Sequence, residues 1–459
     1  MDFDVVVIGG GSAGYAAANA AQSAGARVGI VDKGPLGGLC ILRGCMPTKT
    51  ILRSSDILAL MRRAKEFGLH AENLRADLAA INDRKNRLID EFAHYRIEQL
   101  KDPRFTLIEE FASFTSPHEL NVGNRTITAK NFIIATGSTI ADFPLPGLDT
   151  SGFVTSDDVL EMCDIPRSMI VLGAGPIAVE LAQFFCRIGT KITLIQRSEH
   201  ILSTGDEDLA RPVEARFRKE GMELFTGTKL LQVKKSGNHR TVCFLHEGEE
   251  KSATAEILLQ ALGRKPNIDG LNLDAARVTV EKERIAVDEE MRTNVPHIYA
   301  VGDVNGIHEV VHIAIEQGEI AGHNASQTDM PPRKFDDRLK TSVTFTDPTV
   351  ASVGLSEKEC RAQNISYLTA SYPFDDHGKS ICLGETNGHV KLLCTPESGK
   401  IIGAHIVGPE AGELIHQLIT LMHYKGTVDD LLKIPHYHPT LSEIFAYPAE
   451  ELLGLIKTK

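Results

Sequence analysis

The chain opens with the sequence VVVIGGGSAG, residues 5–14, in which a continuous apolar run leads directly into a glycine cluster. An uninterrupted β-branched run is typical of a strand buried on both faces, as in a parallel sheet. We predict a helix over residues 15–24 and a second strand over 27–31, ending at Asp32. Such a strand–turn–helix–strand unit binds dinucleotides: glycines admit a pyrophosphate to the helix N-terminus, and the acid accepts ribose hydroxyls. The three motif glycines are Gly9, Gly11 and Gly14.

A second unit of the same kind begins at residues 169–178, MIVLGAGPIA. We predict a strand over 169–172, a helix that carries residues 179–182, and a strand over 191–195. The position of the ribose-binding acid holds Gln196 and Arg197, and an arginine without an acid suits the 2′-phosphate of NADP. A solvated loop arginine is the alternative reading of Arg197. Two such units predict FAD in one and a nicotinamide cofactor in the other, with NADP slightly favoured over NAD.

Two cysteines lie between these units, in the sequence GGLCILRGCMPTK, residues 37–49. We expect Cys40 and Cys45 on neighbouring turns of one helix face, close enough for a disulfide. A helix N-terminus and Lys49, four residues after Cys45, would favour a thiolate. A metal site or two buried thiols are the alternatives, but the chain has no Cys-x-x-Cys pair that would complete a zinc site.

Composition limits the classes of partner. A chain of 459 residues predicts several domains, and 49 basic against 61 acidic residues argue against nucleic acid and anionic membranes. The eight cysteines are scattered apart from the one pair, which fits a reducing, cytoplasmic compartment. The start, residues 1–4, is acidic, unlike a signal peptide. Residues 5–26 carry no charge and are long enough to span a bilayer, but a strand, a glycine turn and a helix explain them better.

The sequence HEVVH, residues 308–312, matches the zinc-protease pattern of two histidines one helical turn apart with a glutamate base. It directly follows a strand-then-glycine turn at Gly302 and Asp303, and only Glu316 or Glu319 could be offered, weakly, as a third ligand. We therefore expect no metal.

The character of the chain changes near residue 338. Predicted strands at 343–345, 391–394 and 401–407 alternate with helices and carry no glycine cofactor loop, which indicates a separate α+β domain. That domain ends in PHYHPTLSE, residues 435–443. A carboxylate at Glu443 could hold one ring nitrogen of His438 and raise its basicity, which thiol chemistry requires, although a single histidine is more often structural.

Taken in order, these motifs closely resemble the pyridine nucleotide-disulfide oxidoreductases, the flavoenzymes that include dihydrolipoamide dehydrogenase, glutathione reductase and mercuric reductase. The resemblance covers essentially the whole chain. It implies an α/β fold with two Rossmann-like dinucleotide-binding domains, for FAD and NAD(P), and a C-terminal α+β dimerisation domain. The implied segments are 1–147 and 271–337 for FAD, 148–270 for NAD(P) and 338–459 for dimerisation. It also implies a homodimer in which His438 and Glu443 complete the partner subunit's active site.

The resemblance assigns roles to single residues. Cys45 would lie under the flavin as the charge-transfer thiolate, Cys40 would exchange with substrate, and His438 would serve the leaving thiol. Lys49 would pair with Glu180 beside the flavin N5. The implied cofactor contacts are Gly9, Gly11, Ser12, Gly14, Asp32, Lys33, Gly38, Lys49, Ala135, Thr136, Gly137, Gly173, Gly175, Ile177, Gln196, Arg197, Gly263, Arg264, Gly302, Asp303, His312 and Ala314.

The substrate is less specified. Residues 439–443 look most like dihydrolipoamide dehydrogenase. By contrast, Gln196, Arg197 and Ala178 look more like the NADPH-dependent members of the family. Residues 39–43, around the first cysteine, also depart from the pattern of dihydrolipoamide dehydrogenase. The adjacent C-terminal cysteines of mercuric reductase, and the redox tail of thioredoxin reductase, are missing from the end at 455–459. We expect a dithiol/disulfide oxidoreductase with dihydrolipoamide as its default substrate. Whether the enzyme docks on a 2-oxo acid dehydrogenase complex is left open.

Two alternatives stay open beside this reading. The first is an NADPH-dependent reductase of a small disulfide, as in glutathione reductase, or of another electron acceptor. The second is a non-catalytic flavin-loaded sensor or structural subunit, against which the intact cysteine pair and the His438 and Glu443 pair speak.

Overall fold

The structure is a computed structural model that describes residues 1–326 and 330–457. The last two residues of the C-terminal tail considered above, 458 and 459, lie outside the described residues. The chain divides into two compact units. The first unit combines residues 1–50, 80–142 and 263–336, and the second combines 51–79, 143–262 and the chain from 337 onward.

The first unit is built on a mixed sheet. Strands β1 (Phe3–Ile8), β2 (Val28–Val31), β3 (Phe105–Ile108) and β6 (Arg125–Ile134) run parallel in the order β3-β2-β1-β6, and β18 (Ile298–Ala300) also pairs with β6. The first half of β6 continues into an antiparallel ladder with β5 (Glu119–Val122) and β4 (Ala112–Ser116). Residues 5–7 of β1 have no exposed surface, as expected for a strand covered on both faces.

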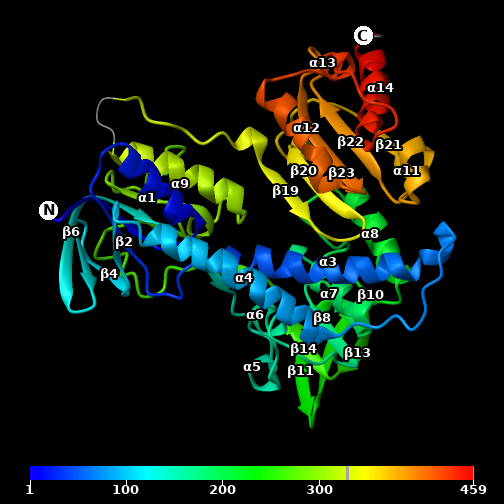
Figure 1. The fold of residues 1–459 in the computed structure, drawn as a ribbon, viewed down its shortest axis with the longest axis horizontal. Helices are drawn as coiled ribbons and strands as arrows, with labels where there is room; N and C mark the ends of the chain where they lie inside the picture. Colours follow the sequence, from blue (N-terminus) through cyan, green and yellow to red (C-terminus); the bar gives the residue numbers. More distant parts are fainter. Residues whose placement is uncertain (327–329, 458–459) are drawn as a thin grey trace. The chain divides into compact units, whose positions relative to one another are not determined.

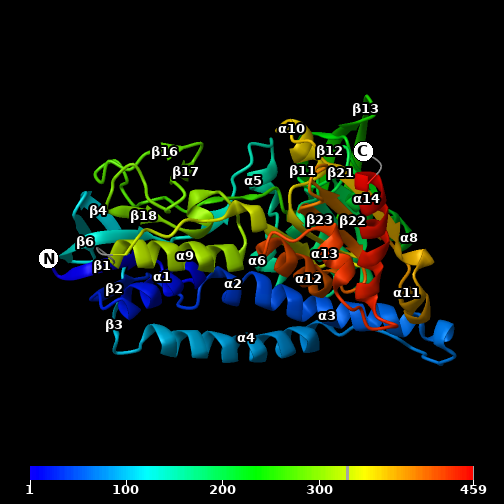
Figure 2. The same cartoon turned by 90° about the horizontal axis from the view of Figure 1, so that it is seen from above.

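Two helices of the first unit, α1 (Ser12–Ser23) and α9 (Val311–Ser326), lie side by side in both views (Figures 1 and 2). Their contact is close because α9 presents glycines to α1. A Cβ atom on Gly318 or Gly322 would lie 2.3 Å from the carbonyl oxygen of Ala13 or Ala17, respectively. The uncharged stretch 5–26 is thus β1, a glycine turn and α1. In the part of the chain that the structure describes, no helix has the length and apolarity of a bilayer span.

The cysteine segment differs from the prediction. Cys40 lies in α2 (Leu39–Leu42), whereas Cys45 begins α3 (Cys45–Arg62), so the two cysteines do not share one helix. Proline is tolerated in the first turn of a helix but not in its interior, where its missing N–H interrupts the series of backbone hydrogen bonds. A helix that began at Leu39 would place Pro47 in its interior. The break at residues 43–44 instead puts Pro47 in the first turn of α3. The long helix α4 (Leu78–Leu100) follows.

The second unit contains the second dinucleotide-binding sheet. Its parallel order is β10-β9-β8-β14, from β8 (Ser168–Leu172), β9 (Lys191–Ile195), β10 (Glu223–Phe225) and β14 (Ile257–Gln260). Helix α7 (Pro176–Ile188) connects β8 to β9, and α8 (Glu207–Lys219) leads to β10. A three-stranded antiparallel sheet, β11 (Lys229–Ser236), β12 (His239–His246) and β13 (Glu249–Ala255), is inserted before β14.

The second unit also contains an antiparallel sheet of order β19-β20-β23-β22-β21. Its strands are β19 (Thr341–Thr344), β20 (Thr349–Gly354), β21 (Leu368–Pro373), β22 (His389–Cys394) and β23 (Ile401–Gly408). Helices α12 (Ala411–His423) and α14 (Ala446–Lys457) pack on it (Figure 2). The shorter helices α10 (Glu357–Ala362), α11 (Gly378–Leu383) and α13 (Val428–Lys433) belong to the same part of the chain, and α13 packs on α14. This is the α+β domain predicted from the sequence.

Candidate functional site

The first glycine loop is shaped by contacts that leave no room for side chains. Gly9 has φ +105°, and a Cβ on it would lie 2.4 Å from the carbonyl oxygen of Ala135. A Cβ on Gly14 would lie 1.8 Å from the carbonyl oxygen of Gly9. Gly11 is the N-cap of α1 and offers no side-chain cap, so Ser12 and the first turn of α1 present backbone N–H groups of the kind that bind anions.

Asp32 ties this loop to the end of β2. Its Oδ2 accepts a hydrogen bond from the Gly10 N–H (2.6 Å), and its Oδ1 accepts one from the Gly34 N–H (2.7 Å). Each carboxylate oxygen retains lone-pair capacity for a ribose hydroxyl. The neighbouring Lys33 places its Nζ 5.3 Å from the centre of the Phe111 ring. Gly38 backs the loop, since a Cβ on it would lie 2.7 Å from the Cα of Gly11.

Two more predicted segments belong to the same unit. Asp303 accepts a hydrogen bond from the Ser138 hydroxyl (2.7 Å), and that hydroxyl accepts one from the Arg264 Nε (2.8 Å). The Gly302 N–H donates to the Oε1 of the fully buried Gln317 (2.8 Å). Ser138 and Gln317 were not predicted, because nothing in their local sequence reveals partners that lie far along the chain.

The remaining predicted residues of the first unit sit near these segments. The Thr136 hydroxyl donates to the Asn267 carbonyl (2.7 Å), the Ala141 N–H donates to the Gly263 carbonyl (3.1 Å), and Gly137 is in the left-handed region. Ala314 is buried, and a Cβ on Gly302 would lie 3.3 Å from its Cβ.

Residues 308–312, HEVVH, do not adopt the helical arrangement of a zinc-protease site. Helix α9 begins at Val311, so His308 and Glu309 precede it and only His312 lies in its first turn. The two histidines are therefore not one turn apart on a helix, as the zinc-protease arrangement requires. Among the residues the structure describes, no group of three metal-ligating side chains is found.

The two cysteines are neighbours as free thiols, with Cys40 half-buried and Cys45 exposed. The hydrogen bond with Cys45 raises the pKa of the Cys40 thiol, and burial raises it further, whereas Lys49 has a weaker opposing effect. The thiolate-favouring environment predicted for this segment therefore does not extend to Cys40. The raised pKa favours the protonated thiol at Cys40.

In the second unit, the glycine loop repeats part of the first. Gly173 has φ +99°, and Gly175 is the N-cap of α7, followed by Pro176 and the partly exposed Ile177. The backbone after β9 is fixed: the Gln196 N–H donates to the Phe225 carbonyl (2.8 Å), and its carbonyl accepts from the N–H and hydroxyl of Thr228 (both 3.0 Å). Arg197 next to it is exposed.

Glu180 and His438 occupy different parts of the second unit. Glu180, on α7, is 2% exposed, and its Oε1 accepts a hydrogen bond from the Phe345 N–H (2.9 Å). The Nδ1 of the exposed His438 lies 2.8 Å from the Oε1 of Glu443, while the Oε2 of Glu443 accepts from the Thr440 N–H (2.7 Å). The Thr440 amide, and then His438, lower the pKa of Glu443, so the carboxylate stays ionised and orients the imidazole.

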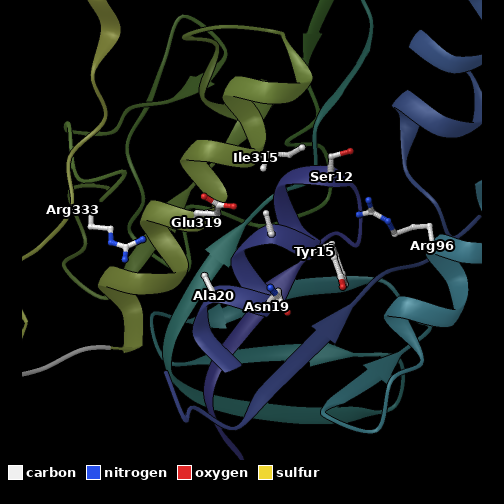
Figure 3. A pocket seen from close by; sticks show the side chains of 9 residues that line it. Ser12, Tyr15, Asn19, Ala20, Arg96, Ile315, Glu319 and Arg333 are labelled. Carbon is white, nitrogen blue, oxygen red and sulfur yellow. The ribbon is translucent and has the colours of Figure 1, made fainter. Parts of the chain in front are cut away.

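A separate cavity of about 380 Å³ lies along α1 and α9 in the first unit (Figure 3). Arg96 reaches it from α4, on the side of Ser12, and its guanidinium stacks 4.5 Å from the centre of the Tyr15 ring. Glu319 and Arg333 line the opposite side. Of the predicted site residues only Ser12 borders this cavity.

Two family models match this chain in sequence. The model described as pyridine nucleotide-disulphide oxidoreductase matches residues 3–318, and the model of the dimerisation domain of the same family matches residues 341–449. Together they cover both glycine loops, the cysteine pair and the His438 and Glu443 pair.

The chain belongs to the pyridine nucleotide-disulphide oxidoreductases.

Known members of this family are similar over most of their length. A mercuric reductase from Staphylococcus aureus is 35% identical over 417 residues, which are 90% of this chain and 76% of that protein. A dihydrolipoyl dehydrogenase from Bacillus subtilis is 32% identical over 425 residues, 91% of this chain and 92% of that protein. The solved structure titled HOCl-induced flavoprotein disulfide reductase RclA from Escherichia coli has a TM-score of 0.85 and 25% identity, covering 97% of this chain and 99% of that one.

Membership of the pyridine nucleotide-disulphide oxidoreductases supports FAD and a pyridine nucleotide as cofactors and a homodimer as the assembly. The residues present fit FAD: the crowded glycine loop, the uncapped N-terminus of α1 and the two accepting oxygens of Asp32 suit an adenosine and a pyrophosphate. They fit a nicotinamide cofactor at the uncapped N-terminus of α7 in the same way.

Proposed function

We propose that this oxidoreductase transfers electrons between NAD(P)H and a dithiol/disulfide substrate through Cys40 and Cys45. The observation that carries the proposal is the hydrogen-bonded thiol pair at the junction of α2 and α3, in the same unit as the first glycine loop. Bound FAD would supply the two-electron relay between the nicotinamide and the cysteine pair.

The chain's own residues would act on thiols and protons. In the reducing direction the imidazole of His438, held by Glu443, would take the proton of the Cys40 thiol as its sulfur attacks a substrate sulfur, and would pass that proton to the departing thiol. Attack of the Cys45 sulfur on Cys40 would then break the mixed disulfide, release the second substrate thiol and leave the Cys40–Cys45 disulfide for re-reduction. Lys49 and Glu180 would stand beside the flavin as a charged pair. His438 and Glu443 would serve the partner subunit of the homodimer.

We propose dihydrolipoamide as the default substrate, supported by residues 439–443 and by the similarity to a dihydrolipoyl dehydrogenase. An NADPH-dependent reductase of a small disulfide or of another acceptor is the second candidate, favoured by Gln196 and Arg197 where an acid would select NAD. Because similar proteins are named mercuric reductase and RclA, electron acceptors other than lipoamide should also be assayed. We place the reaction in the cytoplasm, and docking on a 2-oxo acid dehydrogenase complex belongs to the first candidate alone.

The test is a titration of the purified holoenzyme with NADH and, separately, NADPH, followed by visible absorbance and by disulfide turnover. We expect a long-wavelength charge-transfer band in the wild type. Cys45→Ala should lose that band and disulfide turnover while FAD stays bound. Cys163→Ala is the matched control, because Cys163 is also exposed and lies in the second unit. Normal disulfide turnover by Cys45→Ala would refute the proposal.

A further inference from the structure

One segment of the second unit, residues 196–205, joins β9 to α8 and carries Arg197, the residue expected to contact the 2′-phosphate of NADPH. Arg197 is exposed. The backbone on both sides of it is fixed, because Gln196 is bonded as described above and the Ser198 carbonyl accepts a hydrogen bond from the Gly227 N–H (2.8 Å). The base of the Arg197 side chain therefore has a defined place at the end of β9.

The same segment is bonded to the second glycine loop. The Leu202 N–H donates to the carbonyl of Ala174 (2.9 Å), the residue between the glycines Gly173 and Gly175. Leu202 makes this bond with φ +48°, a conformation that is unfavourable for a residue with a side chain. The bond links the segment to the N-terminus of α7, where the 5′-phosphate side of a dinucleotide would bind. The segment therefore sets the distance between that terminus and Arg197.

The side chain of His200, in the middle of the segment, lies between two carboxylates of α8. Its Nδ1 is 3.3 Å from the Oε1 of Glu214, and its Nε2 is 3.0 Å from the Oε1 of Glu207. The two glutamates are seven residues apart and share one face of the helix. Glu214 is only 6% exposed and also accepts a hydrogen bond from the Ile201 N–H (3.1 Å). The middle of the segment is thus attached to α8.

This arrangement suits the charged form of His200. A neutral imidazole carries one N–H, so one of its nitrogens would turn a lone pair toward a carboxylate oxygen, whereas an imidazolium donates to both carboxylates. Each carboxylate also has an arginine partner one turn along α8, Arg211 for Glu207 and Arg218 for Glu214. Loss of the proton from His200 would therefore loosen the segment while both glutamates keep a cationic partner within the helix.

We propose that His200 is a positioning residue for nucleotide specificity, which as an imidazolium between Glu207 and Glu214 holds Arg197 at the distance from the second glycine loop that NADPH requires. The adenosine of NADPH carries a 5′-phosphate for that loop and a 2′-phosphate for Arg197, whereas NADH carries only the former. His200 acts through Arg197 without touching the nucleotide. The inference rests on the proposed function in one respect, the binding of a 2′-phosphate by Arg197.

The main experiment is calorimetric titration of the holoenzyme at pH 6 with adenosine 2′,5′-bisphosphate and with 5′-AMP, which differ only in the 2′-phosphate. His200→Gln removes the cation between the glutamates. We expect it to weaken binding of the bisphosphate about fivefold and binding of 5′-AMP less than about twofold. His239→Gln, at an exposed histidine that begins β12 in the same unit, is the matched control and should change neither. Equal weakening of both ligands by His200→Gln, or of neither, would overturn the proposal.

An Arg197→Ala background tests whether His200 acts through Arg197. Arg197→Ala alone should weaken binding of the bisphosphate about tenfold. Adding His200→Gln should then cause less than about a twofold further loss, because the side chain that the segment positions is already absent. The full fivefold loss in this background would show that His200 acts independently of Arg197, against the proposal.

A pH series tests the charge of His200. Histidine side chains lose their proton between about pH 5 and 8, so the roughly fivefold difference between His200→Gln and wild type should shrink to less than about twofold at pH 8.5. The 2′-phosphate also titrates in this range, but it does so with both proteins and cancels in the comparison. His200→Arg, whose guanidinium can donate to both carboxylates, should bind the bisphosphate as tightly as the wild type at pH 6 and tighter at pH 8.5.

A difference between His200→Gln and wild type that does not change with pH would contradict a role for the imidazolium. Should His200→Gln fail to fold, the comparison of His200→Arg with wild type carries the same test. Identical pH dependence of bisphosphate binding in those two proteins would then overturn the proposal.

The outcomes also separate this inference from the proposed function. Equal affinity of the wild type for both ligands would end the NADP preference together with the role of His200. A loss of bisphosphate binding in Arg197→Ala with unchanged binding in His200→Gln would overturn the role of His200 alone. None of these results affects the disulfide turnover of Cys45→Ala, which decides the thiol chemistry.

Discussion

The two glycine loops begin alike and then differ. Gly9 and Gly173 have φ of +105° and +99°, and a Cβ on either would lie 2.4 or 2.3 Å from a carbonyl oxygen, that of Ala135 or of Ala261. In both loops the second motif glycine is an N-cap without a side-chain cap, Gly11 for α1 and Gly175 for α7. The same strand, turn and helix thus produce the same anion-binding terminus twice.

Behind that terminus the first loop is closed by its own chain and the second is open. Gly38 backs Gly11, whereas nothing lies within 4 Å of a Cβ on Gly175. The third motif glycine, Gly14, is sterically required, whereas its counterpart is the buried Ala178. A loop held by its own backbone suits a cofactor that stays bound, and an open loop suits one that enters and leaves in each catalytic cycle.

The largest effect is expected from exchanging the third motif residues. Gly14→Ala forces a Cβ to within 1.8 Å of the Gly9 carbonyl oxygen, so the turn must open. We expect FAD binding to weaken by about 100-fold or the protein to fail to fold. The reciprocal control Ala178→Gly should cost only about 1 kcal/mol of unfolding free energy and keep FAD. The measurements are the FAD-to-protein absorbance ratio and thermal unfolding. Wild-type FAD content in Gly14→Ala would show that the first loop is not closed.

Asp32→Asn should have the next largest effect. An amide can offer only one oxygen where the carboxylate accepts from the Gly10 and Gly34 N–H groups, so one buried donor loses its partner at a cost of about 1–3 kcal/mol. We expect FAD to dissociate about tenfold or more faster, measured by flavin fluorescence after dilution. Asp142→Asn is the control, since Asp142 is an exposed carboxylate of the same unit. Equal dissociation rates in the two variants would contradict a tied first loop.

Arg197→Glu tests the nucleotide preference of the second unit, in which Arg197 follows β9. The arginine would donate charge-assisted hydrogen bonds to a 2′-phosphate, so the variant should raise the KM for NADPH about 10- to 100-fold and change the KM for NADH far less. Arg167→Glu, on another exposed arginine of the second unit, should leave both values unchanged. Steady-state kinetics with each nucleotide decides the matter, and an unchanged ratio of the two KM values would end the NADP assignment.

The smallest effect on nucleotide binding is expected from a change at Asp206, beside helix α8, which follows β9 in the second unit. Asp206 precedes this helix, and its Oδ2 accepts from the Nζ of the buried Lys391 (2.8 Å). Burial acts to raise the pKa of Asp206, but Lys391 and the backbone amides of Lys358 and Glu357 lower it overall. Since the folded-state pKa is depressed, the carboxylate stabilises the fold above the unfolded value of about 3.9, and this is lost as pH falls below it.

Asp206→Asn should therefore lower the free energy of unfolding by about 1–2 kcal/mol at pH 7, and the difference from wild type should shrink below about pH 4. Urea unfolding at pH 7, 4 and 3 measures this, with FAD content expected to stay at the wild-type level at pH 7. A difference that grows on acidification would show that the sign is wrong.

Elements of the fold that depend on neighbouring residues in the sequence could be predicted, whereas those that depend on contacts between distant residues could not. The strands and helices of both glycine loops follow from apolar runs and glycine spacing, and the α+β domain from the change of pattern near residue 338. The helix break at residues 43–44 was missed, although Pro47 signalled it. The residues 308–312 match the spacing of a zinc-protease helix without forming one, because spacing alone does not show where a helix begins and α9 begins at Val311.

The missed parts of the site are side chains whose partners lie far along the chain. Ser138 and Asp303 are 165 residues apart, as are Glu180 and Phe345. A serine or a glutamine has no local signature that distinguishes a solvated side chain from one that fixes a turn. Only the folded arrangement of the segments, set by the sheets, brings such pairs together.

The pairing of α1 with α9 has a consequence for how the protein is made. Helix α1 ends at Ser23, but α9, whose glycines pack on the backbone of Ala13 and Ala17, begins at Val311. A ribosome that adds about 5–20 residues per second needs roughly 15–60 s to synthesise the chain between them. During that time α1 lacks the helix that packs against it, and β6 lacks its partner β18. The first glycine loop is thus among the first segments to be synthesised, while the unit that contains it is completed only after Asp336 has left the ribosome.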